Sequence, residues 1–174
     1  MSRFKRTFIN ILMITVLFFL FIKIAGLYFT PMSAHKNAER SAHYGPSEVV
    51  HIEEYKNEKY LLSKYDKWIS CNTVRRTFLF FWTSGAYVHG FENDVTKDID
   101  YSWNGSDYNY RLFGIRNNNS IEKIEFTMKN GDVLSTTTFY DDLFLITFKE
   151  HEDGMYNIEN IKGYDKNNNI IYEK

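Results

Sequence analysis

An uncharged segment near the amino terminus, FINILMITVLFFLFI over residues 8–22, places the strongest constraint on this chain. Lys23 interrupts the segment, but mainly apolar residues continue to Thr30, so the usable span is 8–30. A helix of about 20 mainly apolar residues is long enough to cross the hydrocarbon of a bilayer. The sequence therefore predicts a transmembrane anchor over 8–30. We expect Pro31 to end it, because proline cannot continue the helical hydrogen-bond ladder.

Two other interpretations of this segment stay open. A cleaved signal peptide has an apolar region of about 7–15 residues followed by a small-x-small cleavage site. The candidate sites that end at Ala25, Gly26 and Ala34 each have a large residue two positions earlier, where a small one is needed. The third interpretation is a buried core helix of a soluble protein. We favour the uncleaved anchor.

The distribution of charge predicts how the chain is oriented. Arg3, Lys5 and Arg6 lie in the short tail over 1–7, and such cationic flanks stay cytoplasmic. All 22 acidic residues follow the apolar segment, with 17 of the 21 lysines and arginines, so the outer part has five more negative than positive charges. This balance argues against nucleic acid as a partner, because nucleic-acid binding needs a basic patch. The one cysteine allows no internal disulfide, which favours a bacterial cell envelope over a eukaryotic secretory route.

The remainder divides into a linker and one domain. Residues 31–46 are polar and small, which is typical of a juxtamembrane linker or a short helix. Residues 47–174 suffice for one core. They are rich in aromatic residues and in short alternating segments separated by turn residues. We expect a mainly β extracytoplasmic domain with eight to ten short strands, arranged as an antiparallel β-sandwich or an open β-barrel.

The clearest hairpin signal lies near Asn130-Gly131. This dipeptide favours a two-residue type I′ turn, in which both central residues have positive φ and Lys129 faces Asp132. The preceding segment alternates apolar and polar residues, which places three apolar side chains on the buried face: Ile124, Phe126 and Met128.

The apolar sequence FLFFW over 78–82 has two interpretations. It is either a strand that is buried on both faces, or a patch that dips into the membrane. Five residues cannot span a bilayer. We favour the buried strand.

The best candidate site is the acidic, irregular stretch over 92–107, which contains a predicted turn at Asn104-Gly105. Clustered carboxylates can bind Ca²⁺ or act on a glycosidic bond, and neighbouring aromatic rings can stack on a sugar. The other interpretation, which we favour, is a solvated acidic loop whose aromatic side chains turn into the core. The candidate binding residues are Asp94, Asp98, Asp100, Tyr101 and Trp103.

No motif in the sequence indicates catalysis, a metal or a cofactor. There is no H-E-x-x-H, G-x-S-x-G, G-x-G-x-x-G or P-loop. The stretch DKNNN over 165–169 resembles the start of an EF-hand loop, but Ile170 occupies the required glycine position, so we interpret it as a hairpin turn.

These observations predict a single-pass membrane protein with a binding, scaffolding or sensing role in the bacterial cell envelope. Its partners would be the lipid bilayer, through the amino-terminal helix, and an envelope protein or a glycan. Two alternatives stay open. One is a cell-surface hydrolase that acts on glycan or peptide through residues 92–107, and the other is an immunity-type protein that blocks a toxin.

Overall fold

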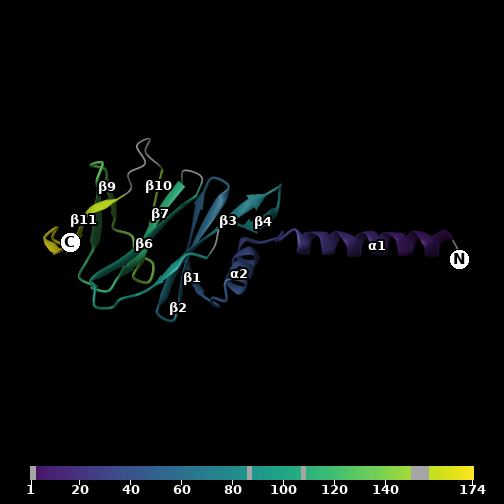
Figure 1. Ribbon diagram of the computed structural model, residues 1–174, viewed down its shortest axis with the longest axis horizontal. Helices are drawn as coiled ribbons and strands as arrows, with labels where there is room; N and C mark the ends of the chain where they lie inside the picture. The colour runs from purple at the N-terminus through teal and green to yellow at the C-terminus, as the bar shows by residue number, and fades with distance from the viewer. Residues whose placement is uncertain (1–2, 86–87, 107–108, 150–156) are drawn as a thin grey trace.

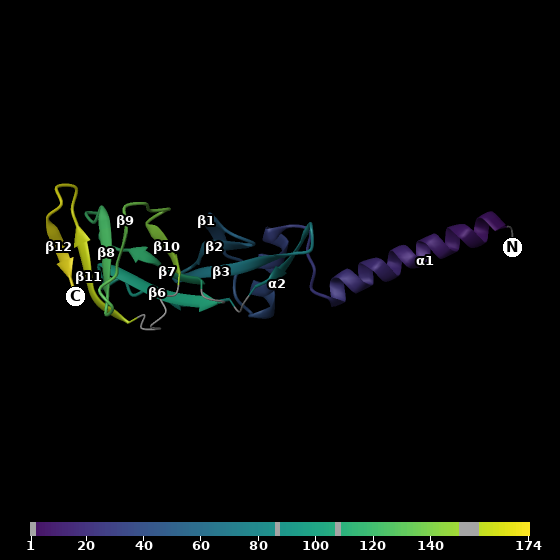
Figure 2. The same ribbon diagram turned by 90° about the horizontal axis from the view of Figure 1, so that it is seen from above.

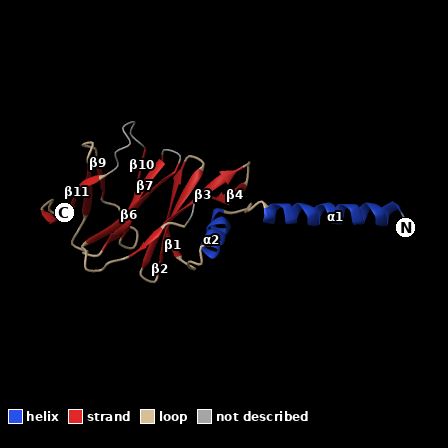
Figure 3. Ribbon diagram, viewed as in Figure 1, coloured by secondary structure: helices blue, strands red, loops and turns tan. Residues whose placement is uncertain are grey.

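The computed structural model describes residues 3–85, 88–106, 109–149 and 157–174. Within these residues two helices precede twelve strands (Figures 1 and 3). The helices are α1 (Arg3–Ile24) and α2 (Pro31–Ser41). The strands are β1 (Glu48–Tyr55), β2 (Glu58–Tyr65), β3 (Trp68–Thr77), β4 (Phe81–Ser84), β5 (Gly90–Glu92), β6 (Ile99–Ser106), β7 (Asn109–Arg116), β8 (Lys123–Met128), β9 (Val133–Thr136), β10 (Leu143–Lys149), β11 (Ile158–Tyr164) and β12 (Ile170–Glu173).

The strands form three antiparallel sheets. Sheet A has the order β1-β2-β3-β4, and β5 also pairs with β3. Sheet B has the order β10-β7-β6, and sheet C has the order β12-β11-β8-β9. The prediction of a mainly β, antiparallel, sandwich-like domain is confirmed. Most neighbouring strands are consecutive in sequence, as expected, but β10 crosses to β7 and β11 crosses to β8.

Sheet B is the middle layer of the body (Figure 2). Consecutive residues of a strand point to opposite faces of its sheet. On β7, Leu112 belongs to the apolar cluster that contains Phe126 of sheet C, whereas Phe113 belongs to the cluster that contains Tyr60 of sheet A. Two cores, one on each side of sheet B, therefore hold the three sheets together.

Helix α2 covers the outer face of sheet A. Ala34 packs there against Leu61 of β2 and Val74 of β3, and all three side chains are buried. Most of the predicted juxtamembrane linker, 31–46, is therefore helical and packed on the domain. Pro31 does not end the apolar helix as predicted, because α1 covers Arg3–Ile24 rather than 8–30. Pro31 is instead the first residue of α2, where a missing N–H costs no hydrogen bond.

The hairpin between β8 and β9 confirms the predicted faces but not the predicted turn. Ile124, Phe126 and Met128 are buried, as expected. The loop has three residues rather than two, since Met128 N–H donates to the carbonyl of Asp132 at 2.8 Å. Gly131 has a φ of +89°, but Asn130 is not among the residues with positive φ. The pairing of Lys129 with Asp132 was therefore wrong, and the loop is a turn closed by a glycine bulge.

Candidate functional site

The connector between α1 and α2 attaches α1 directly to the edge of sheet A. Tyr28 N–H donates to the carbonyl of Trp82 at 2.8 Å, and Trp82 N–H donates to the carbonyl of Tyr28 at 2.7 Å. Gly26, with a φ of +63°, turns the chain out of α1. Only three residues separate the end of α1 at Ile24 from this pairing. The body of the protein therefore begins immediately beside the apolar helix.

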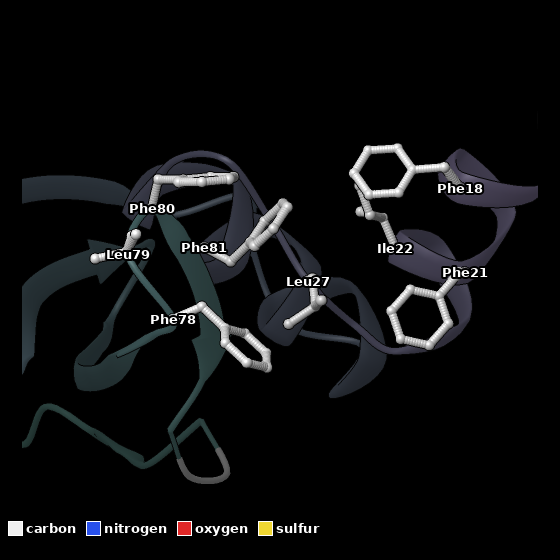
Figure 4. A pocket seen from close by; sticks show the side chains of 8 residues that line it. All are labelled: Phe18, Phe21, Ile22, Leu27, Phe78, Leu79, Phe80 and Phe81. Atoms are coloured by element: carbon white, nitrogen blue, oxygen red, sulfur yellow. The ribbon is translucent and has the colours of Figure 1, made fainter. Parts of the chain in front are cut away.

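An open hollow of about 490 Å³ lies where α1 meets the hairpin between β3 and β4 (Figure 4). Ile22, Leu27 and Phe81 form a buried cluster at its base. No residue that lines the hollow has a polar side chain. The lining residues are Phe18, Phe21, Ile22, Leu27, Phe78, Leu79, Phe80 and Phe81.

We call residues 78–80, which join β3 to β4, the apolar tip. Thr77 pairs with Phe81 across the hairpin, so Phe78, Leu79 and Phe80 form the turn. Their exposed fractions are 79%, 80% and 56%. The prediction of a buried strand over 78–82 was therefore wrong for residues 78–80, whereas Phe81 and Trp82 belong to β4 and Phe81 is buried. An apolar sequence was taken as a sign of burial, but a three-residue reversal holds these side chains beyond the edge of the sheet.

Arg76 braces the backbone of the apolar tip. Its guanidinium donates from Nε to the carbonyl oxygen of Leu79 at 3.0 Å and from Nη2 to the same oxygen at 2.5 Å. Phe78 has a φ of +55°, a conformation that is costly for a bulky side chain. The turn is therefore built from residues that a water-exposed hairpin seldom uses.

Asp100 organises the predicted acidic site as a closed loop. This carboxylate is 6% exposed. Its Oδ2 accepts from the backbone N–H of Asp94 at 2.8 Å, and its Oδ1 accepts from Lys97 Nζ at 3.0 Å. Asn117 fastens the same loop by donating from Nδ2 to the carbonyls of Asp94 and Lys97. The predicted turn at Asn104-Gly105 was wrong, since both residues lie inside β6.

Hydrogen bonds within this loop also shift the pKa values of two of its charged side chains. Hydrogen bonds from the hydroxyl and backbone N–H of Thr96 lower the pKa of Asp94, and the hydrogen bond to Asp100 raises the pKa of Lys97. Asp98 contributes its backbone carbonyl, which accepts from Asn117 N–H at 2.8 Å. The Asp94 and Asp100 carboxylates thus hold the loop together, an arrangement that does not resemble a glycosidase pair flanking a sugar.

The two aromatic candidates have different surroundings. Tyr101 packs edge-on against Phe126 with ring centroids 5.4 Å apart, so it belongs to the core between sheets B and C. Trp103 is 44% exposed and lies 6.0 Å from the ring of Tyr110. A hollow of about 360 Å³ along β6 brings part of the predicted set together, without Asp94 or Asp98. It is lined by Lys97, Ile99, Asp100, Tyr101, Ser102, Trp103 and Lys174.

A buried polar centre beneath α2 was not anticipated from the sequence. His35 Nε2 lies 3.3 Å from Glu39 Oε1, and Asn72 Nδ2 donates to His35 Nδ1 at 3.1 Å. The hydroxyl of Ser47 donates to the same Glu39 carboxylate. Burial lowers the pKa of His35, and the charge of Glu39 only partly opposes this effect. The i,i+4 spacing of His35 and Glu39 was the one available signal in the sequence. Such spacing indicates a side-chain pair that stabilises a helix, not a catalytic pair.

Arg111 is fully buried between sheets A and B. Its guanidinium carbon lies 5.0 Å from the centre of the Tyr60 ring, and no oxygen in the described part of the chain accepts a hydrogen bond from its nitrogens. Burial raises the pKa of the neighbouring Cys71 thiol to about 12, although Arg111 partly opposes that shift. Cys71 is thus an unreactive core residue. Within the described ranges, no three His, Cys, Asp or Glu side chains gather in a way that could hold a metal ion.

Comparison of the chain with known protein families, with curated proteins and with solved structures finds no match.

Proposed function

We propose that this protein is a single-pass membrane protein that holds a β domain at the surface of the bacterial cell envelope, where the domain binds an envelope protein or a glycan. The amino terminus lies in the cytoplasm and the domain lies outside. The observation that carries this proposal is the solitary apolar helix α1.

The dimensions and exposure of α1 fit a bilayer. Its 22 residues extend about 33 Å at 1.5 Å per residue, close to the roughly 30 Å of a hydrocarbon core. Ile22 is its only buried residue, so α1 is not a core helix of the domain. Large side chains such as Phe8, Leu17 and Phe21 are each more than half exposed. Lipid is the surrounding that removes this apolar surface from water.

The contacts at the end of α1 support an anchor that is retained rather than a cleaved signal peptide. Ile22 is 6% exposed because it packs against Leu27 and Phe81. Cleavage after residue 25 or 26 would remove Ile22 and leave Phe81 without that cover. The helix is thus part of the packing of the domain and not merely joined to it.

The proposed binding face lies along β6. This strand ends sheet B, so within the residues that the structure describes one of its edges is not paired with another strand of the sheet. Exposed Trp103 offers an aromatic surface, and Lys97, which lines the same hollow, offers charge beside it. Aromatic rings next to charged groups suit either a sugar ring or an extended peptide. The hydrolase and immunity-type alternatives have no observation in their favour.

Labelling of introduced cysteines tests the topology. The background is low, because the natural thiol, Cys71, is buried and has a raised pKa. We expect a membrane-impermeant maleimide to label Val133→Cys in intact cells and to label Lys5→Cys only after permeabilisation. Val133 is 56% exposed and begins β9. Figure 1 shows β9 far from α1. Labelling of position 5 in intact cells would refute the orientation.

Cross-linking in intact cells tests the binding role. We expect Trp103→Ala to lose a cross-linked envelope component that the parent chain retains. Trp68→Ala is the matched control, since Trp68 is similarly exposed, at 38%, on sheet A. Equal capture by both variants would exclude β6 as the binding face.

A further inference from the structure

We propose that the apolar tip inserts into the bilayer that α1 spans, so that the domain contacts lipid at two places. This inference rests on the proposed function, because it takes α1 to be a membrane helix. The occupant of the surface around the tip is phospholipid.

The residues of the apolar tip are unusual for a hairpin turn. Hairpin turns favour glycine, asparagine and aspartate, which tolerate positive φ and water. Here the turn is Phe-Leu-Phe, and its first residue, Phe78, adopts a φ of +55°. A strained backbone that carries exposed apolar side chains is typical of a functional site rather than of a plain connection. Packing within the chain does not explain the choice, since Phe78 and Leu79 are about four-fifths exposed.

The position of the tip also supports its insertion. Phe18 and Phe21 of α1 line the same hollow as the tip, and Figure 4 shows the two groups on its opposite sides. Phe18 lies six residues before the end of α1, which corresponds to about 9 Å of helix. When α1 is in a bilayer with Phe18 in the acyl region, the tip on the opposite wall faces that region too. Interfacial segments bury their apolar faces to about 5–10 Å.

A hydrogen bond within the hairpin prepares a backbone carbonyl of the tip for an apolar environment. A backbone carbonyl that enters lipid without a partner is strongly penalised. At the tip the carbonyl of Leu79 already accepts two hydrogen bonds from Arg76. Arginine also places its charge where phosphate headgroups lie while its stem stays against apolar surface.

The lining of the hollow favours lipid over a protein. Protein interfaces pair an apolar centre with a polar rim that forms hydrogen bonds. All eight residues that line the hollow are apolar, which suits acyl chains. The hollow also continues directly into the surface of α1. With two lipid contacts the domain cannot rotate freely about the axis of α1, so the face along β6 keeps a fixed orientation to the membrane.

The test uses the full chain in vesicles of phosphatidylcholine and phosphatidylglycerol. An environment-sensitive NBD fluorophore is attached to Phe80→Cys, and in a matched control to Val133→Cys on the distant hairpin. Cys71 is buried and contributes no label. We expect blue-shifted emission at position 80 and several-fold stronger quenching by spin-labelled lipid than at position 133.

A second variant excludes insertion driven by the fluorophore itself. The double variant Phe78→Asn/Leu79→Ser introduces two residues that suit a hairpin turn and removes most of the apolar surface of the tip. NBD at position 80 should then lose its blue shift, while the protein still floats with the vesicles.

The outcomes separate this inference from the proposed function. Emission at position 80 that matches position 133, in a chain that floats, overturns tip insertion and leaves the anchor intact. A blue shift without quenching by lipid indicates a second copy of the chain at the tip and also overturns the inference. A chain that does not float overturns both proposals.

Discussion

At the scale of single residues, polar groups buried beneath α2 make stability depend on pH. The folded environment of His35 lowers its pKa below the ordinary value of 6.5, because burial outweighs the nearby charge of Glu39, while Lys36 acts in the same direction as burial. The unfolded chain therefore takes up a proton at higher pH than the folded chain does. Neutral, buried His35 therefore contributes its full stabilisation above about pH 6.5. This stabilisation is lost as the pH falls from 6.5 through the lowered pKa of the folded state.

We accordingly expect the melting temperature of the full chain in detergent to fall between about pH 7 and pH 5. His35→Gln should flatten this dependence, because glutamine does not titrate. Some slope will persist, since burial also lowers the pKa of His89. An unchanged slope in His35→Gln would show that another group is responsible.

Gly131 gives a second prediction at this scale. Its φ of +89° suits glycine, and a Cβ atom there would meet nothing within 4 Å. The cost of Gly131→Val is therefore backbone strain alone, about 1–3 kcal/mol. Urea unfolding of the full chain in detergent, followed by tryptophan fluorescence, measures it. Lys129→Val adds a β-branched residue to the same turn without positive φ. Equal midpoints for the two variants would contradict the assignment.

Backbone conformation in the β8–β9 hairpin follows from residue type, but the side-chain bonding of its loop does not. The positive φ of Gly131 was predictable from the dipeptide, because few residues tolerate that conformation. The three-residue length of the loop was not, since Asn130 Oδ1 accepts from Asp132 N–H at 3.0 Å and this local bond stabilises the longer turn. Asp100 could be named as a candidate, but its bonding to Asp94 and Lys97 depends on how the loop folds.

At the scale of elements, alternation located most strands but could not distinguish a buried apolar segment from an exposed one. The hairpins at 48–65 and 158–173 follow from period-two patterns and turn residues. The segment 78–82 has no polar residue, so its pattern carries no information on which side faces water. The exposure of residues 78–80 became evident only from the register of β3 and β4, which makes these three residues the turn. The helix over 31–41 was weakly encoded, because short polar helices depend on packing against a neighbouring element.

The pairing of β2 with β3 provides a prediction at this scale. Glu58 is 6% exposed, and its carboxylate accepts from Arg75 Nε at 2.9 Å and from the hydroxyl of Tyr60 at 3.0 Å. Arg75→Met would leave the buried carboxylate of Glu58 without its cationic partner. We expect the free energy of unfolding to fall by about 2–3 kcal/mol. Lys64→Met on β2 removes a cation whose carboxylate partners, Glu48 and Asp141, are more than half exposed, so it should cost less than about 1 kcal/mol.

Thermal unfolding of the two variants provides the comparison. The double variant Arg75→Met/Glu58→Leu should recover part of the loss, because the buried charge is then absent. Similar losses for Arg75→Met and Lys64→Met would show that the pair contributes no more than a surface contact.

At the scale of the whole molecule, composition indicated a β domain on a membrane anchor but not its layering. Sheet B is covered on both faces. This layering depends on which strands that are not consecutive in sequence pair with each other. The pairing of β10 with β7 joins residues 28 to 40 positions apart, from Leu143 with Ile115 to Lys149 with Asn109, which local patterns do not encode. The resulting order, from α1 through sheets A and B to sheet C, places the carboxyl terminus at the end of the molecule away from the anchor (Figures 1 and 2).

The last prediction is that α1 remains attached to the domain. A small-x-small site is needed for cleavage, and Lys23 blocks the one that would end at Ala25. We expect the chain in the membrane fraction to begin at or near Met1, with an intact mass near 20.7 kDa. Lys23→Ala is the matched control, because it creates Ala-Ile-Ala and should allow partial cleavage after Ala25. A parent chain that begins between Gly26 and His35 would refute retention. It would also remove Ile22 from its contact with Leu27 and Phe81, so the freed domain would expose the base of the hollow and bind detergent or lipid there.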